Sequence, residues 1–109
     1  MHELGLARNI VSIVCEHANG QAVQRVRLEL GSLSAVASDA IRFCFDICAK
    51  GTLAEGAELQ IDEIQARGVC LDCRREMQLE QQSWICSCGS NKIQCLAGLE
   101  LKVKEMEVA

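Results

Sequence analysis

Apolar residues recur along this chain with two different periods, and the changes of period separate helices from strands. Between residues 4 and 18 an apolar residue follows every third or fourth position, as one face of an amphipathic helix requires. The stripe consists of Leu6, Ile10, Ile13 and Val14, and Ala7 and Val11 widen it. We therefore expect the chain to begin with a helix that packs this stripe against a core.

Three later stretches alternate apolar and polar side chains and predict half-buried strands. They cover residues 23–30, 57–66 and 99–108. In the last stretch Leu99 and Leu101 begin the apolar row, with charged residues between its members. Such alternation is typical of a sheet with one face on a core and one in water.

A second helix is expected between the first two strands, over residues 38–51. Ser38 is a suitable N-cap and Gly51 is suited to close the last turn. Ile41 and Phe45 lie one turn apart and would form its apolar face.

This order of elements predicts an α+β fold with two helices on a small three-stranded sheet. A segment rich in cysteine, with little apolar periodicity, interrupts the domain before the last strand. We place the α+β domain at residues 1–67 and 96–109, and an inserted cysteine hairpin at residues 68–95.

Composition narrows the range of functions. The chain has 109 residues with 11 basic and 15 acidic side chains, and the bases form no cluster. This distribution argues against a nucleic-acid partner. No stretch approaches the roughly 20 apolar residues of a membrane span, and no signal peptide is evident. We therefore expect a cytoplasmic protein, where eight cysteines serve as metal ligands or buried thiols rather than disulfides.

Four of the cysteines have the spacing of a metal site. Cys70 and Cys73 form a C-x2-C pair, and after twelve intervening residues Cys86 and Cys88 form a C-x-C pair. Two paired thiolates on facing turns are a common way to hold structural zinc. The shorter second pair is not expected to offer the backbone N–H groups that usually donate to the sulfurs.

The remaining cysteines are first interpreted as small buried hydrophobic residues. This applies to Cys15, Cys48 and Cys95. Two alternatives stay open: Cys95 could replace a member of the short pair, and Cys44 with Cys48 could share a metal across one helical turn.

The first residues could bind a metal as well. The amine of Met1, the amide of His2 and its imidazole are few enough bonds apart to chelate nickel or copper. A solvated terminus is the alternative. His17, the only other histidine, is expected to lie in solvent near the end of the first helix. No catalytic triad and no phosphate loop is present, so we do not expect an enzyme.

Several stretches together resemble the HypA/HybF family of hydrogenase nickel-incorporation proteins. They are MHE at the start, VRLELGSLSAV, FCFDICAKGTLAEGAELQI, the two cysteine pairs and the closing GLELKVKEMEV. The resemblance covers essentially the whole chain in the right order. The family usually has CPxC at the second pair, whereas this chain has C-x-C.

The resemblance implies a metallochaperone that carries Ni(II) to the large subunit of a nickel-iron hydrogenase, assisted by a HypB-type GTPase. Met1, His2 and Glu3 match the family's nickel-binding start. The four paired cysteines match its zinc ligands, which makes the α+β domain the nickel-binding part and residues 68–95 the zinc-binding part. Partners then include those two proteins, without nucleic acid or membrane. A homodimer stays an open alternative to a monomer, since the sequence does not decide the oligomeric state.

Two other classes compete with this interpretation. A zinc-ribbon interaction module would hold zinc, bind a protein partner and carry no transferable metal, so MHE would be accidental. A redox protein would use one cysteine pair as a dithiol and hold no tight zinc. Nickel stoichiometry before and after His2→Ala separates the first alternative from a nickel carrier.

Overall fold

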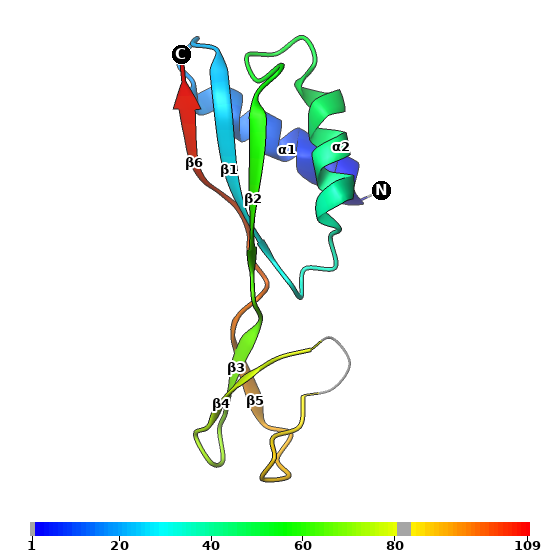
Figure 1. Cartoon of the computed structure of the whole chain (residues 1–109), viewed down its shortest axis with the longest axis vertical. Helices are drawn as coiled ribbons and strands as arrows, with labels where there is room; N and C mark the ends of the chain where they lie inside the picture. The colour runs from blue at the N-terminus through cyan, green and yellow to red at the C-terminus, as the bar shows by residue number, and fades with distance from the viewer. Residues whose placement is uncertain (1, 81–83) are drawn as a thin grey trace. The chain divides into compact units, whose positions relative to one another are not determined.

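The structure is a computed structural model of the whole chain and describes residues 2–80 and 84–109. Two helices precede most of the strands, and the second half of the chain consists of strands and turns (Figure 1). The elements are α1 (His2–His17), β1 (Val23–Gly31), α2 (Ser38–Ala49), β2 (Glu58–Ile64), β3 (Arg67–Cys70), β4 (Glu76–Gln78), β5 (Ile93–Ala97) and β6 (Leu101–Val108).

The chain divides into two compact units. The helical unit comprises Met1–Glu29, Val36–Asp62 and Lys102–Ala109. The cysteine unit comprises Leu30–Ala35 and Glu63–Leu101. Each unit contains segments that are distant in sequence. Contacts between these segments therefore stabilise each unit internally.

The helical unit is built on a three-stranded sheet of order β2-β1-β6, with α1 and α2 packed against each other. In Figure 1 α1 crosses behind the strands, which agrees with burial of one face of the central strand. Val26 and Leu28 of β1 are fully buried, whereas Arg25 and Arg27 lie on the other face. The α+β fold with two helices and a small three-stranded sheet is therefore confirmed.

The buried face of α1 differs slightly from the predicted stripe. Ile10 and Val14 are buried as expected, and so are Ala7 and Val11, which widen the stripe. Ile13, which the sequence pattern placed on the stripe, is 45% exposed. The small side chain of Ala7 allows close packing, so the helix turns this side inward and leaves Ile13 at the margin.

The ends of α2 show one error and one success of the sequence interpretation. Ala37 is the N-cap and makes no side-chain cap hydrogen bond, while Ser38 is already the first helical residue. The predicted capping by Ser38 is therefore wrong. Gly51 follows the helix with a φ of 77°, a left-handed conformation that glycine adopts without strain.

The last strand begins later than the alternation suggested. Leu99 lies before β6 and is 63% exposed, so its assignment to the apolar row is wrong. The turn before it explains the shift: Gly98 has a φ of 120°, and its N–H donates to the carboxylate of Glu100 at 2.7 Å. A strand that starts at Leu101 is the result.

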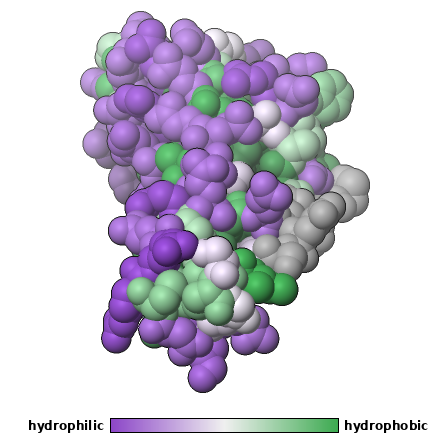
Figure 2. Space-filling view, turned by 60° about the horizontal axis from the view of Figure 1, so that its bottom comes forward, coloured by the Kyte–Doolittle hydropathy of each residue, from purple (hydrophilic) through white to green (hydrophobic). Residues whose placement is uncertain are grey.

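The cysteine unit contains a second three-stranded sheet, of order β4-β3-β5, which the sequence did not predict. Both pairings of β3 are antiparallel, and Cys70 lies opposite Ile93. Figure 2 shows apolar residues exposed among hydrophilic ones on this side of the protein. The large exposed apolar residues of this unit are Leu71, Ile85, Leu96 and Leu99.

Candidate metal centre

The first cysteine turn extends β3 into β4 and is closed by two backbone hydrogen bonds. The N–H of Cys70 donates to the carbonyl of Arg75 at 2.9 Å, and the N–H of Arg74 donates back to the carbonyl of Cys70 at 2.8 Å. Arg74 adopts a φ of 66° to complete the turn. Cys73 lies inside this loop, so its thiol is turned toward the same side as that of Cys70.

The second cysteine turn has the same closure with one residue fewer. The N–H of Cys86 donates to the carbonyl of Ser90, and the N–H of Gly89 donates to the carbonyl of Cys86, both at 2.8 Å. Gly89 has a φ of 93°, which allows this tighter turn. The single-residue difference between the turns matches the difference between the two cysteine spacings. The short C-x-C pair therefore lies in a turn that is one residue shorter than the turn of the C-x2-C pair.

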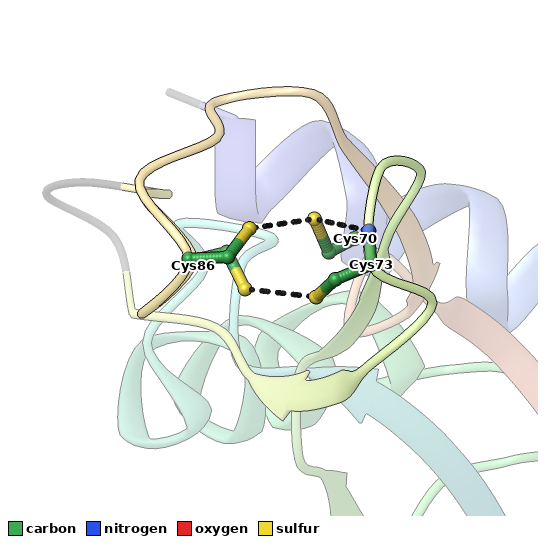
Figure 3. A group of neighbouring side chains, drawn as sticks. Cys70, Cys73 and Cys86 are labelled. Carbon is green, nitrogen blue, oxygen red and sulfur yellow. Dashed lines mark hydrogen bonds between the residues drawn. The ribbon is translucent and has the colours of Figure 1, made fainter.

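The two turns bring four sulfur atoms together (Figure 3). The Sγ atoms of Cys70, Cys73, Cys86 and Cys88 all lie within 4.8 Å of one another. Sγ–Sγ distances are 3.7 Å for Cys70–Cys88 and 3.5 Å for Cys73–Cys86. Bonds of about 2.3 Å to a central zinc place tetrahedral thiolates about 3.8 Å apart. The quartet therefore fits a zinc ion in both ligand type and spacing.

Backbone N–H groups act on sulfur in both turns, although none of those in the short pair comes from the residue between its two cysteines. In the first turn, the N–H of Cys73 donates to the Sγ of Cys70 at 3.5 Å. In the second turn, the backbone N–H of Cys88 favours the thiolate of Cys86 and lowers its pKa, and the N–H of Ser90 acts in the same direction on the pKa of Cys88.

The backbone N–H groups and the closeness of the four thiols shift the pKa values of the cysteines in opposite directions. The N–H of Cys73 lowers the pKa of Cys70 to about 6. The N–H of Cys88 likewise lowers the pKa of Cys86. At Cys88 the N–H of Ser90 acts in the same direction, but the thiol of Cys86 and burial outweigh it and raise the pKa to about 12. Without a cation the quartet therefore keeps protons, and a divalent ion would favour four thiolates.

Two side-chain hydrogen bonds connect the turns beside the sulfurs. The guanidinium of Arg75 donates to the hydroxyl of Ser87 at 2.6 Å. The hydroxyl of Ser90 donates to the carboxylate of Asp72. Sequence reasoning missed these pairs. The only sequence signal for these hydrogen bonds is the presence of Ser87 and Ser90 near Cys88, and a serine alone does not reveal which residue it pairs with.

The other cysteines lie away from the quartet. Cys95 is in β5, and its thiol donates to the carbonyl of Ala97 at 3.4 Å, so the structure does not use it in place of a quartet member. Cys15, Cys48 and Cys95 are half-buried rather than buried. Within residues 2–80 and 84–109, the quartet is the only close group of three or more His, Cys, Asp or Glu ligands.

The candidate nickel residues lie at the start of α1. Met1 and the side chain of His2 fall outside the described residues, although His2 is the first residue of the helix. Glu3 is half-buried in the first turn. His17 is exposed and its Nδ1 lies 2.8 Å from the carbonyl of Ile13, in keeping with a solvated residue at the helix end.

The fold and the quartet define a small α+β protein with a cysteine centre suited to zinc. No helix in the described part of the chain has the length and apolarity to cross a membrane. Residues 1–108 match the family model "Hydrogenase/urease nickel incorporation, metallochaperone, hypA". The chain belongs to this family, which confirms the resemblance found in its sequence.

Relatives and solved structures agree with the family match. The chain is 55% identical over 108 residues to "Hydrogenase maturation factor HypA" of Nostoc punctiforme, covering 99% of this chain and 96% of the relative. The same protein of Rippkaea orientalis is 54% identical over 109 residues, with the same coverage. The solution structure of the Ni metallochaperone HypA from Helicobacter pylori has a TM-score of 0.71 at 20% identity, covering 97% of this chain and 96% of that one. This structural likeness supports the fold.

Proposed function

We propose that this protein is a nickel metallochaperone that binds Ni(II) at its N-terminus and delivers it for the maturation of a nickel-iron hydrogenase. The observation that carries the proposal is the family match over residues 1–108, which includes both the MHE start and the cysteine quartet. The family consists of maturation factors rather than catalysts, so this chain would act by binding and transfer.

The nickel ligands in this proposal are Met1, His2 and Glu3. An amine, an imidazole and deprotonated backbone amides suit the square-planar field that Ni(II) favours. Because α1 begins at His2, the first backbone N–H groups of the helix have no partner within the helix. Those amides are therefore available to lose a proton and bind metal. The carboxylate of Glu3 would offset the positive end of the helix dipole beside the cation.

A terminal site of this kind suits a carrier. Its ligands lose protons on binding, so nickel affinity would rise with pH. An ion held at a chain end is also accessible to a receiving protein. The receiving partners in this proposal are a HypB-type GTPase and the hydrogenase large subunit, in the cytoplasm.

The quartet would hold a structural zinc ion. Cys70, Cys73, Cys86 and Cys88 supply four thiolates and leave no open position, which is the arrangement of structural rather than catalytic zinc. Bound zinc would supply charge neutralisation and link the two turns. We assign nickel binding to residues 1–67 and 96–109 and zinc binding to residues 68–95.

Titration of Ni(II) into zinc-loaded protein tests the proposal. We expect one nickel ion per chain in the protein that begins at Met1, and its loss in His2→Ala, with one zinc ion retained in both by elemental analysis. His17→Ala is the matched control, because His17 is exposed and bonds only a backbone carbonyl in its own helix. Nickel binding that persists in His2→Ala would contradict the proposal and point to the cysteines as the nickel ligands.

A second variant tests the role of the terminal amine. Two residues added ahead of Met1 remove the amine from chelating distance but leave His2 and Glu3 in place. We expect this variant to lose most of its nickel affinity while circular dichroism and zinc content stay unchanged. Unchanged nickel affinity would exclude the amine as a ligand.

A further inference from the structure

The four thiols of the quartet form two close pairs, and each pair joins the first turn to the second. The Sγ atoms of Cys73 and Cys86 are 3.5 Å apart, and those of Cys70 and Cys88 are 3.7 Å apart. Figure 3 shows both contacts between the two turns. The sulfurs of a disulfide lie about 2.05 Å apart, so each pair would have to close by about 1.5 Å to form one.

Exposure to solvent differs within each pair. Cys73 and Cys88 are exposed, whereas Cys70 and Cys86 are buried. An oxidant from solvent therefore reaches one thiol of each pair first, and the shielded thiol across the turns lies beside the sulfur that has been oxidised. An accessible thiol next to a second, resolving thiol is the usual arrangement of cysteines that respond to oxidants.

We propose that the quartet is a peroxide-sensitive modification site, at which oxidation replaces the zinc ion by two disulfides between the turns, Cys73–Cys86 and Cys70–Cys88. The inference rests on the structural zinc of the proposed function and does not involve the nickel site. It gives the centre two alternative forms, four thiolates on a metal ion or two disulfides without one. Both forms link the two turns.

The chemistry consumes one hydrogen peroxide molecule for each disulfide. The exposed thiolate attacks one oxygen of the peroxide, the O–O bond breaks, and a sulfenic acid forms while hydroxide leaves. The thiolate across the turns then attacks the sulfenic sulfur, which forms the S–S bond and releases a second hydroxide. Two protons from solvent convert the hydroxides to water. The two sulfurs lose two electrons to the peroxide and no longer act as thiolate ligands, so the metal ion is released.

The geometry of the turns favours disulfides between them over disulfides within them. A bond between Cys86 and Cys88 would close a ring through a single residue, Ser87, which leaves little freedom to meet the geometry that a disulfide requires. In the first turn, the sulfur of Cys70 accepts the N–H of Cys73 at 3.5 Å, which holds it against the backbone of that turn. The pairs between the turns are already in contact, so closing them leaves the backbone hydrogen bonds of both turns in place.

Contacts that do not involve sulfur also hold the two turns side by side. The side chains of Asp72 and Arg75 each make a hydrogen bond with a serine of the second turn. The N–H of Leu71 donates to the carbonyl of Lys92 at 2.9 Å, which joins the first turn to the residues that follow the second. These contacts would keep the thiol pairs aligned while the metal ion leaves.

Peroxide treatment of zinc-loaded protein without nickel tests the proposal. Elemental analysis first establishes the zinc content, and a chromophoric chelator then follows zinc release as hydrogen peroxide is added. We expect one zinc ion to be released per chain for every two peroxide molecules consumed. Dithiothreitol with added zinc should restore the original zinc content.

Mass spectrometry of tryptic peptides identifies the disulfides. Trypsin cleaves after Arg74 and Arg75, so the first cysteine pair lies in residues 68–74 and the second in residues 76–92. We expect these two peptides to be linked to each other, and fragmentation should assign Cys73 to Cys86. Cys95→Ser is the matched control, because Cys95 lies in the same unit but outside the quartet, and it should show the same zinc release and the same links.

The possible results separate this inference from the proposed function. Zinc that is retained under peroxide, separate peptides that each carry an internal disulfide, links of Cys73 to Cys88, or sulfinic acids in place of disulfides would each overturn the inference. Protein purified without bound zinc would instead contradict the structural zinc itself.

A second measurement compares oxidation with chelation, since both remove the metal ion. In a ¹H–¹⁵N spectrum we expect the oxidised, zinc-free protein to keep dispersed amide resonances in the cysteine unit. The reduced protein treated with a chelator should lose them, because nothing then links the two turns through the sulfurs. Loss of dispersion in the oxidised protein as well would overturn the inference that the disulfides take over the role of the metal.

Discussion

The two units of this protein are stabilised by different kinds of contact. The helical unit packs a continuous set of buried aliphatic side chains around Phe45 and Leu28. In the cysteine unit, the buried hydrophobic residues among those described are Leu30, Ala66, Cys70, Leu79 and Cys86. Two of these five are members of the quartet. The helical unit therefore has a core of its own, whereas the cysteine unit depends on what its thiols bind.

Removal of zinc should reveal the largest difference in stability between the two units. We expect a chelator, or Cys70→Ser, to unfold the cysteine unit while the helical unit keeps its secondary structure. Zinc binding typically supplies on the order of 10 kcal/mol to small cysteine sites, more than the few buried residues of this unit can replace. Amide resonances in a ¹H–¹⁵N spectrum, assigned to each unit, provide the measurement. Cys95→Ser is the control, and dispersed resonances throughout the chelated protein would contradict the expectation.

Truncation of a side chain in the apolar core should destabilise the helical unit and leave the cysteine unit unchanged. Phe45 is 1% exposed, and Phe45→Ala should lower the free energy of unfolding of the helical unit by about 3–5 kcal/mol. Phe43, on the same helix, is 67% exposed, so Phe43→Ala should change it by less than about 0.5 kcal/mol. Urea denaturation followed by circular dichroism measures both variants. Zinc content should stay at the wild-type value, and its loss in Phe45→Ala would show that the two units are not independent.

The same contrast explains what the sequence could predict. Periodicity located α1, β1, α2, β2 and β6 because these elements present an apolar face to a core. It missed the sheet of the cysteine unit, whose strands are as short as the three residues of β4 and bury few apolar side chains. Exposure of Ile13 and Leu99 depends on packing and on a turn, which local pattern does not contain.

For the metal centre, spacing was sufficient to name the four cysteines that the structure brings together. It was not sufficient to show how a C-x-C pair reaches the same centre as a C-x2-C pair. That depends on the closure from Cys86 to Ser90, a backbone hydrogen bond that residue types do not specify. The hydrogen bonds of Asp72 and Arg75 to serines of the second turn depend in the same way on how the two turns are arranged.

Lower pH should weaken the zinc site in two stages. The pKa of Cys70 is lowered from 9.0 to about 6, so its contribution to the stability of the metal-free unit is present above pH 9 and lost as pH falls through 6. Cys88, with a pKa raised to about 12, must lose a proton to bind zinc at any pH below that value. Each displaced proton lowers zinc affinity about tenfold per pH unit.

The slope of zinc affinity against pH should therefore become steeper by one proton below about pH 6, where Cys70 also becomes protonated. Competition with a chromophoric chelator, corrected for the chelator's own protonation, measures this slope. Circular dichroism at each pH shows whether the helical unit remains folded. A constant slope through pH 6 would show that Cys70 does not titrate there.

The smallest effect concerns the side-chain bonds between the turns. Ser90 donates to Asp72 and accepts from the N–H of Lys92 at 3.1 Å, so Ser90→Ala removes two contacts that position the second turn. We expect zinc affinity to fall about tenfold, as is typical when groups that orient metal ligands are lost. Ser12→Ala on α1 is the matched control and should leave affinity unchanged. If Ser90→Ala also leaves zinc affinity unchanged, the backbone hydrogen bonds that close the short turn, together with the bound metal, would be enough to position Cys86 and Cys88.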